Sequence, residues 1–189
     1  MKLLKNHIYS GLFFLLILIS SCKKQSQNSV DPTEENELIT TIKLSFVDTG
    51  NLTDTFRFTW RQIGGPGTLI VRDTIRLTAQ KTYQGFIEIL DESKSPVFNV
   101  TSEIKTLQNE HRFIYSSSTS RLSLVSTDWD TNIPPIELGL KFLASTSDSG
   151  NSTGSLGILL KHYTVSSPKT AGILAGSTDI DVSFPVLIP

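Results

Sequence analysis

The residues best suited to metal binding are two histidines and the carboxylates near them. His111 follows Glu110, and His162 ends an alternating apolar run that begins at Leu156. Neutral imidazole and carboxylate oxygen are ligands that suit zinc or copper. The histidines are 51 residues apart without a diagnostic spacing, so only the fold can bring them together. The alternative is that each histidine is held by hydrogen bonds at the end of a strand.

A second candidate lies where Asp128, Asp130 and Asn132 place oxygen ligands at alternate positions, as at the start of a calcium loop. The segment departs from the EF-hand pattern, because Ile133 stands where glycine is needed and Gly139 where glutamate is needed. It predicts either another kind of calcium loop or a turn in which Asp and Asn bond the local backbone. Taken together, the candidate ligands for zinc, copper or calcium are Glu110, His111, Asp128, Asp130 and His162.

No segment has the pattern of a catalytic centre. The glycine-rich stretch 64–67 lacks the lysine and helix of a phosphate loop and is typical of a wide hairpin turn, and residues 154–157 lack the spacing of a nucleophile elbow. Asp179 and Asp181 fall in a strand pattern and are interpreted as solvent-facing. Trp60 is in phase with a core face, whereas Trp129 is the better candidate for contact with a ligand at the surface. We expect no catalytic residues, no enzymatic activity and no organic cofactor.

The amino terminus predicts export and lipidation. Lys2 and Lys5 precede the apolar run 11–19, which is too short to span a bilayer as a helix and is typical of a signal peptide. The tetrapeptide Ile19-Ser20-Ser21-Cys22 resembles the lipobox of bacterial lipoproteins, which implies cleavage after residue 21 and acylation of Cys22. Two or three acyl chains hold a protein on a membrane almost permanently. The alternative is a secreted protein with a free thiol.

Composition limits the remaining classes. The chain of 189 residues is 38% hydrophobic and 19% charged, so it is neither disordered throughout nor a coiled coil. Removal of residues 1–21 takes away two lysines and leaves 15 Lys+Arg against 18 Asp+Glu, a formal charge of -3, which gives no basic field for nucleic acid. One cysteine excludes an intrachain disulfide. Residues 22–37 comprise the lipidated cysteine and a polar, flexible tether.

From residue 38 to residue 189 the pattern predicts strands. Apolar residues alternate with polar ones most clearly over 42–46, 56–60 and 180–186, and six weaker candidates are 68–77, 82–90, 111–116, 121–126, 136–143 and 155–163. A single short helix is expected over 102–108, capped by Thr101. Eight or nine strands without crossover helices favour one all-β domain, an antiparallel β-sandwich of the Ig-like or Greek-key type.

Several stretches resemble a family of small Bacteroidota outer-membrane lipoproteins that carry the loose name of a type 1 periplasmic binding fold. The matching stretches are Glu37-Leu-Ile-Thr-Thr-Ile-Lys-Leu44, Thr82-Tyr83, Glu110-His111-Arg112-Phe113, Asp128-Trp129-Asp130, Leu138-Gly139-Leu140, Leu160-Lys161-His162 and Thr178-Asp179-Ile180-Asp181-Val182-Ser183-Phe184-Pro185. The resemblance implies an outer-membrane lipoprotein whose gene lies near that of a TonB-dependent receptor. That family name implies an α/β fold, whereas the period-two pattern predicts strands.

These observations favour a non-catalytic binding or accessory module, anchored to the outer membrane through acylated Cys22 and assisting the uptake of a nutrient or metal by a TonB-dependent receptor. The periplasmic and the cell-surface face both stay open. Alternatives are a structural or adhesive envelope protein, a metal-binding protein that uses His111 and His162, and a hydrolase.

Overall fold

The alternating segments form two β-sheets whose apolar faces pack against each other. The computed structural model describes residues 38–65, 67–147, 151–165 and 167–189. The predicted signal peptide (1–21), Cys22 and the tether (22–37) lie outside the described residues. Among the described residues there is one α-helix, and no helix is long and apolar enough to cross a bilayer. The expectation of an all-β sandwich is confirmed, and the α/β fold implied by the family name is not observed.

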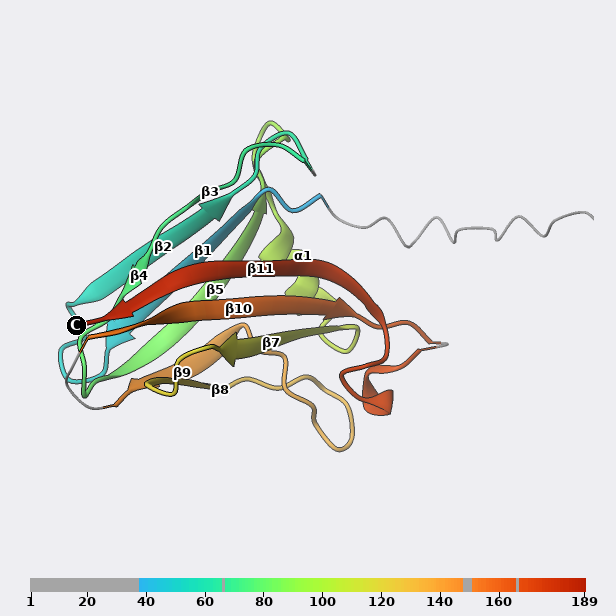
Figure 1. Ribbon diagram of the computed structural model, residues 1–189. Coiled ribbons are helices and arrows are strands. Elements are labelled where there is room, and N and C mark those ends of the chain that lie inside the picture. Colours follow the sequence, from blue (N-terminus) through green and yellow to red (C-terminus); the bar gives the residue numbers. More distant parts are fainter. Residues whose placement is uncertain (1–37, 66, 148–150, 166) are drawn as a thin grey trace, which may run out of the picture. The chain divides into compact units, whose positions relative to one another are not determined.

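The larger sheet has the strand order β3-β2-β1-β5-β9-β8, and β6 pairs with the end of β5 (Figure 1). Its strands are β1 (Thr41–Asp48), β2 (Thr55–Arg61), β3 (Val71–Arg72), β5 (Thr82–Asp91), β6 (Phe98–Asn99), β8 (Leu122–Ser126) and β9 (Lys141–Thr146). The hairpin between β2 and β3 carries the glycine-rich stretch, as expected of a wide turn.

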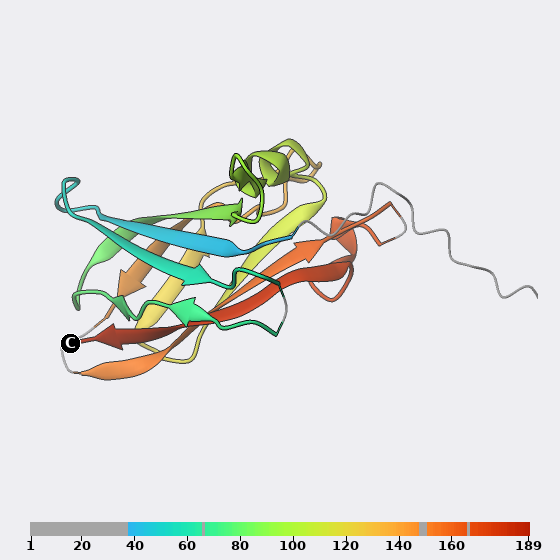
Figure 2. The same ribbon diagram turned by 90° about the horizontal axis from the view of Figure 1, so that it is seen from above.

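The smaller sheet has the order β4-β11-β10-β7. Its strands are β4 (Ile75–Arg76), β7 (His111–Ser117), β10 (Ser152–His162) and β11 (Ser177–Ile188), and a 3-10 turn, η1 (Lys169–Ala171), precedes β11. Figure 2 shows the smaller sheet lying across the larger one. The β4-β11 pair is parallel and every other strand pair in the described residues is antiparallel, so the sandwich departs from the purely antiparallel prediction at one two-residue strand.

The core lies between the inward faces of the two sheets. Alternating residues of β1 and of β10 are almost fully buried, as the period-two pattern predicts, and they are Ile42, Leu44, Phe46, Leu156, Ile158 and Leu160. Trp60 belongs to this core, in agreement with its phase in the sequence. Burial of side chains of this size contributes about 2 kcal/mol each, which is the main stabilising effect in the fold.

The predicted strand over 136–143 begins only at Lys141, because the residues before it cross from one sheet to the other. The Leu138 carbonyl accepts a hydrogen bond from the Phe113 N–H in the smaller sheet, and the Leu140 carbonyl accepts one from the Ile87 N–H in the larger sheet. Gly139 makes the crossing at a φ of 84°, where a Cβ would lie 2.9 Å from Phe113. The segment therefore ties the sheets together and does not extend β9.

The predicted helix is present as α1 (Val100–Thr106), but its cap is Asn99 and not Thr101. The Asn99 side chain accepts from the Ser102 N–H at 3.2 Å, as an N-cap residue does. Thr101 is occupied elsewhere, because its hydroxyl accepts from the Ile89 N–H of β5 at 2.7 Å. Residues 107–110 connect the end of α1 to the start of β7.

Candidate metal centre

The two histidines meet as neighbours across β7 and β10. His111 is the first residue of β7 and His162 the last of β10, and the register of these antiparallel strands places them opposite each other. Side chains in such a pair point to the same face of the sheet. The two imidazole rings stack with their centroids 4.7 Å apart and their planes 15° from parallel. Strand register therefore brings together two histidines that are 51 residues apart in the sequence.

The His111 ring is held in place by the end of α1. Its Nδ1 lies 3.1 Å from the carbonyl oxygen of Leu107, the C-cap residue of the helix. Because a carbonyl only accepts, Nδ1 carries the hydrogen and Nε2 keeps its lone pair. Burial lowers the pKa of His111 to about 4, although the bond to Leu107 acts in the opposite direction. His111 is therefore neutral near pH 7, in the state that ligates metals.

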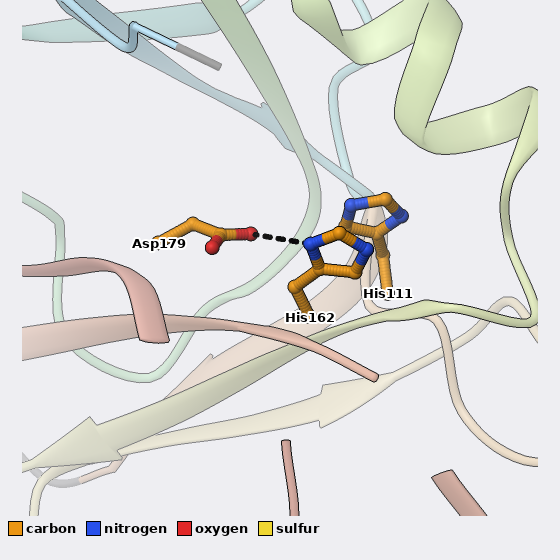
Figure 3. Close-up of side chains that lie close together, drawn as sticks. All are labelled: His111, His162 and Asp179. Atoms are coloured by element: carbon orange, nitrogen blue, oxygen red, sulfur yellow. Dashed lines mark ion pairs between the residues drawn. The ribbon is translucent and has the colours of Figure 1, made fainter. Parts of the chain in front are cut away.

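Asp179 joins the histidines because β11 contains a bulge. Leu160 pairs with Ile180 and Lys161 with Thr178, so Asp179 is an extra residue in the ladder. A bulge re-aims a side chain that a regular strand would direct outward. The Asp179 side chain is only 8% exposed, and its Oδ2 lies 4.0 Å from Nδ1 of His162 (Figure 3). The interpretation of Asp179 as solvent-facing is therefore wrong, whereas Asp181 is exposed as expected.

The other carboxylate oxygen of Asp179 is buried and has no hydrogen-bond partner among the residues that the structure describes. Burial raises the pKa of Asp179, and the nearby His162 and Lys161 only partly oppose this effect. A buried acceptor without a donor is costly for the fold. Such an oxygen is well placed to accept a proton or a cation.

Glu110 adds a fourth group at the solvent side of the cluster. Its Oε2 lies 3.8 Å from Nε2 of His162, and its side chain is half exposed. Both ion-pair distances to His162 exceed the range of a hydrogen bond. His162 thus faces Asp179 with one ring nitrogen and Glu110 with the other.

His111, His162 and Asp179 are here called the two-histidine cluster. One ligand atom from each lies within 4.8 Å of the others. A tetrahedral ion with bonds of about 2.1 Å needs ligand atoms roughly 3.4 Å apart. Because stacked rings direct their lone pairs along parallel planes, an ion bound here requires one ring to rotate. His162 is the ring free to do so, since Leu107 fixes His111.

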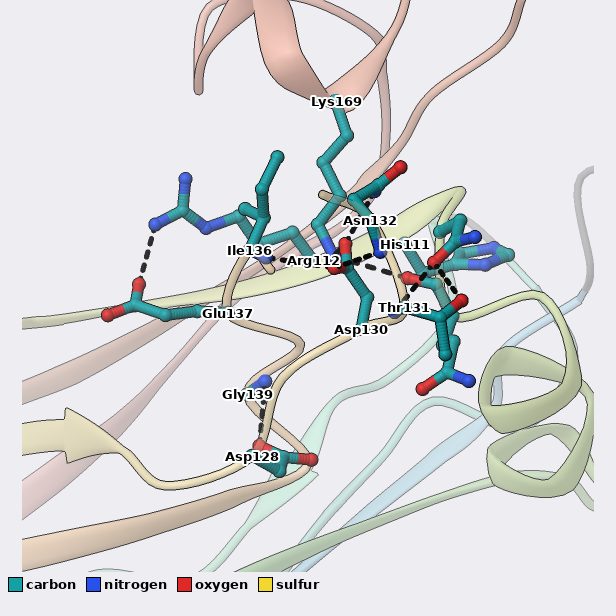
Figure 4. Close-up of polar contacts among 12 residues, drawn as sticks. His111, Arg112, Asp128, Asp130, Thr131, Asn132, Ile136, Glu137, Gly139 and Lys169 are labelled. Carbon is teal, nitrogen blue, oxygen red and sulfur yellow. Dashed lines mark hydrogen bonds and ion pairs between the residues drawn. The ribbon is translucent and has the colours of Figure 1, made fainter. Parts of the chain in front are cut away.

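The two predicted ligands Asp128 and Asp130 do not join this cluster. They lie in the loop between β8 and β9, where they bond to other groups (Figure 4). Oδ1 of Asp128 accepts from the N–H groups of Gly139 and Lys141 at 3.0 and 3.1 Å. These bonds hold the crossing segment 136–140 in place. The structure thus brings together Glu110, His111 and His162 from the predicted set and adds Asp179.

Asp130 is the centre of a separate polar network. Its Oδ1 accepts from the N–H groups of Asn132 and Ile136, and its Oδ2 accepts from the Asn132 side chain. Oδ2 also pairs at 2.8 Å with Nζ of Lys169, and both side chains of this pair are almost fully buried. Burial raises the pKa of Asp130, but the hydrogen bonds outweigh it and the pKa lies below its ordinary value. The arrangement is the Asp/Asn turn that the sequence analysis weighed against a calcium loop.

Two further features are the exposed side chain of Trp129 and a cavity beside Asp179. Trp129 is 55% exposed, in agreement with its interpretation as a surface residue. A cavity of about 490 Å³ lies between the two sheets, and Ile42 of β1, Trp60 of β2 and Asp179 of β11 are among the residues that line it. The two-histidine cluster therefore borders an open space as well as the protein interior.

Asp179 is the functional candidate that the sequence pattern did not reveal. The alternation of Ile180, Val182 and Phe184 correctly predicts the inward face of β11, and the same alternation assigns Asp179 to the outer face. The bulge turns Asp179 away from the outer face, and the alternation of apolar residues does not reveal the bulge. The resemblance stretch 178–185 contained Asp179, and this was the one available sign.

Comparisons with protein-family models, with curated proteins and with solved structures found no match to this chain. The function is therefore inferred from the geometry of the site and from the sequence.

Proposed function

We propose that the chain is a lipid-anchored, non-catalytic binding module of the outer membrane that binds a transition-metal ion, zinc or copper, at the two-histidine cluster. The observation that carries this proposal is the stacked pair of His111 and His162 beside Asp179, whose buried oxygen has no hydrogen-bond donor in the described part of the chain. Two imidazoles and a carboxylate form a ligand set that suits either ion. Glu110, 3.8 Å from His162, is the nearest group that can complete the coordination.

The neutral state of His111 supports the proposal. Metal ligation requires deprotonated imidazole, and ordinary histidines lose affinity for metals as they gain a proton near pH 6.5. Burial keeps His111 unprotonated to about pH 4. Its bond to Leu107 also fixes the ring orientation, which is the role that outer-shell carbonyls have at known metal sites.

Metal titration by isothermal calorimetry, with elemental analysis of the washed protein, tests the proposal. We expect one zinc or copper ion per chain, and at least a tenfold loss of affinity in His111→Ala, His162→Ala and Asp179→Asn. The matched control is Asp181→Asn, which removes the same charge two residues away on the exposed face of β11. Substoichiometric metal in the wild-type protein, or equal loss in Asp179→Asn and Asp181→Asn, contradicts a site at this cluster.

The proposed partner is a TonB-dependent receptor in the same membrane. It is supported by the family resemblance and by the predicted lipid anchor at Cys22. Affinity purification of the tagged chain from membranes should recover such a receptor, and deletion of the chain should slow uptake of the bound metal. An unchanged uptake rate together with solitary purification contradicts this part of the proposal and leaves metal binding itself to be judged by titration.

A further inference from the structure

Two adjoining loops carry the most exposed large apolar side chains of the described residues. Val165, Ile133 and Leu174 are 101%, 97% and 95% exposed relative to a free side chain. Ile133 lies in the β8–β9 loop, and Val165 and Leu174 lie in the connection between β10 and β11. Trp129 and Ile173, on the same loops, are each about half exposed. These five residues are here called the apolar tip. Scattered apolar residues are ordinary on a surface, whereas a group on neighbouring loops indicates an interaction site.

The loops are fixed to one another. Lys169 of the second loop forms its buried ion pair with Asp130 of the first, and its Nζ also donates to the Gln108 carbonyl at 3.1 Å. Thr131 of the first loop donates to the Asn109 side chain through its N–H at 3.0 Å. Since the loops are held in this way, the apolar side chains stay presented outward in the folded protein.

The apolar tip and the first described residue, Leu38, both lie in the part of the sandwich away from the C-terminus (Figure 1). Leu38, the first described residue, lines the same cavity as Asp179, and Asp179 contacts His162, three residues before Val165. In Figure 1 the start of β1 and these loops lie away from the marked C-terminus. A flexible tether of 16 residues, as the sequence predicts, spans roughly 22 Å on average. The lipid proposed at Cys22 therefore brings a membrane surface within reach of the apolar tip.

We propose that the apolar tip inserts shallowly into the membrane surface that holds the Cys22 lipid. This inference rests on the proposed lipid anchor and goes beyond it, because it assigns an orientation to the domain. Aliphatic side chains at protruding loops suit the deformable region between headgroups and acyl chains, and Trp129 is of the type that lies at that interface. A second contact next to the lipid also limits how far the domain can rotate on its tether.

Fluorescence of Trp129 in vesicles tests this proposal. The chain has two tryptophans, so Trp60→Phe leaves Trp129 as the single reporter in the full acylated protein. In phosphatidylethanolamine and phosphatidylcholine vesicles we expect a blue shift and quenching by lipids brominated near the top of the acyl chain. Ile133→Ser/Val165→Ser/Leu174→Ser should reduce the quenching at least fourfold. The control Leu52→Ser alters a side chain that is 70% exposed on the β1–β2 turn and should change nothing.

A second arm separates this proposal from the lipid anchor. Mass spectrometry reports whether Cys22 is acylated, and sedimentation of the Cys22→Ser chain with the same vesicles reports the apolar tip alone. We expect weak binding that persists at high salt and falls at least tenfold in the triple variant. Val165→Ser alone, at a fully exposed position, should lower binding without a change in unfolding temperature. Aqueous emission from Trp129 on the vesicles overturns the proposal, and so does loss of a protein partner in the triple variant with unchanged vesicle binding.

Discussion

Two polar clusters lie side by side at one end of the sandwich and differ in how completely their atoms are bonded. Around Asp130, both carboxylate oxygens accept two hydrogen bonds each, one of them from Lys169. In the two-histidine cluster, one oxygen of Asp179 has no hydrogen-bond partner among the described residues, and the contacts of His162 to Glu110 and Asp179 are long, at 3.8 and 4.0 Å. A network in which every polar atom is hydrogen-bonded holds the chain in place and leaves no free atom to bind a ligand. The comparison favours a structural role for the Asp130 network and supports the proposal of a metal site at the two-histidine cluster.

The largest expected effect comes from breaking the Asp130 network. Asp130→Ala leaves the ammonium group of Lys169 buried without a counterion, which should destabilise the fold by about 3 kcal/mol or more. Chemical denaturation of the metal-free protein measures this loss. Asp130→Leu/Lys169→Met, which removes both charges, should recover most of it. As a reference, Lys43→Met at the half-exposed pair with Glu88 should cost less than about 1 kcal/mol. Equal losses of unfolding free energy at the two sites would show that the buried ion pair stabilises the fold no more than the exposed one.

A pH effect of similar size should come from His111 in the metal-free protein. The folded pKa of about 4 lies below the ordinary value of 6.5, so the unfolded chain binds more protons between these limits. The free energy of unfolding should therefore fall as the pH decreases from about 6.5 to 4, by about 3 kcal/mol in all. Urea unfolding at intermediate pH values measures the slope. His111→Phe should flatten it, and an unchanged slope would mean that His111 is not the titrating group.

Zinc should stabilise the wild-type fold by about 2.7 kcal/mol at a free concentration one hundred times the dissociation constant. Thermal unfolding with and without zinc measures this gain, and a chelator should reverse it. Asp128 lies outside the two-histidine cluster and accepts hydrogen bonds from the N–H groups of Gly139 and Lys141, so Asp128→Asn should keep the zinc response. A response that disappears in Asp128→Asn and persists in His162→Ala would place the zinc site in the β8–β9 loop and not at the two-histidine cluster.

The smallest expected change in stability comes from replacing Asp179 in the two-histidine cluster. Burial raises the pKa of Asp179 above its ordinary value, so ionisation of this carboxyl at neutral pH costs free energy in the folded state. Asp179→Asn should therefore raise the stability of the metal-free protein near pH 7 and also remove the zinc response. Denaturation curves of this variant and of Asp181→Asn provide the measurement. A destabilised Asp179→Asn would indicate that Asp179 serves the fold.

The sequence predicted the fold well because most of it follows from alternation. The strands that hold Ile42, Phe58 and Phe184 follow the period-two pattern, and their inward faces form the core. The segment 136–140 did not follow it, because hydrogen bonds across the sheets and the positive φ of Gly139 redirect a chain whose composition resembles a strand. The prediction of one strand over 68–77 was wrong, because the chain there forms β3 and β4, which have two residues each and belong to different sheets. The strand β6 was not predicted, since two residues are too short to produce a pattern.

The candidate site was predictable only in part. The chemistry of His111 and His162 and their place at strand ends could be inferred, but their contact depends on the register of β7 and β10. Grouping Asp128 and Asp130 with them relied on residue type alone, and local N–H groups occupy these carboxylates. Asp179 was missed because a bulge changes which face a residue occupies without changing the sequence around it.

The bulge at Asp179 also bears on how such a site can arise. Deletion of one codon at this position would make β11 a regular strand, and the core residues from Ile180 onward could keep their pairing with β10. The carboxylate would then be lost from the interior while the sandwich remained. A single in-frame insertion or deletion can thus create or remove the third ligand, which lets the ligand set change during evolution without rebuilding the domain.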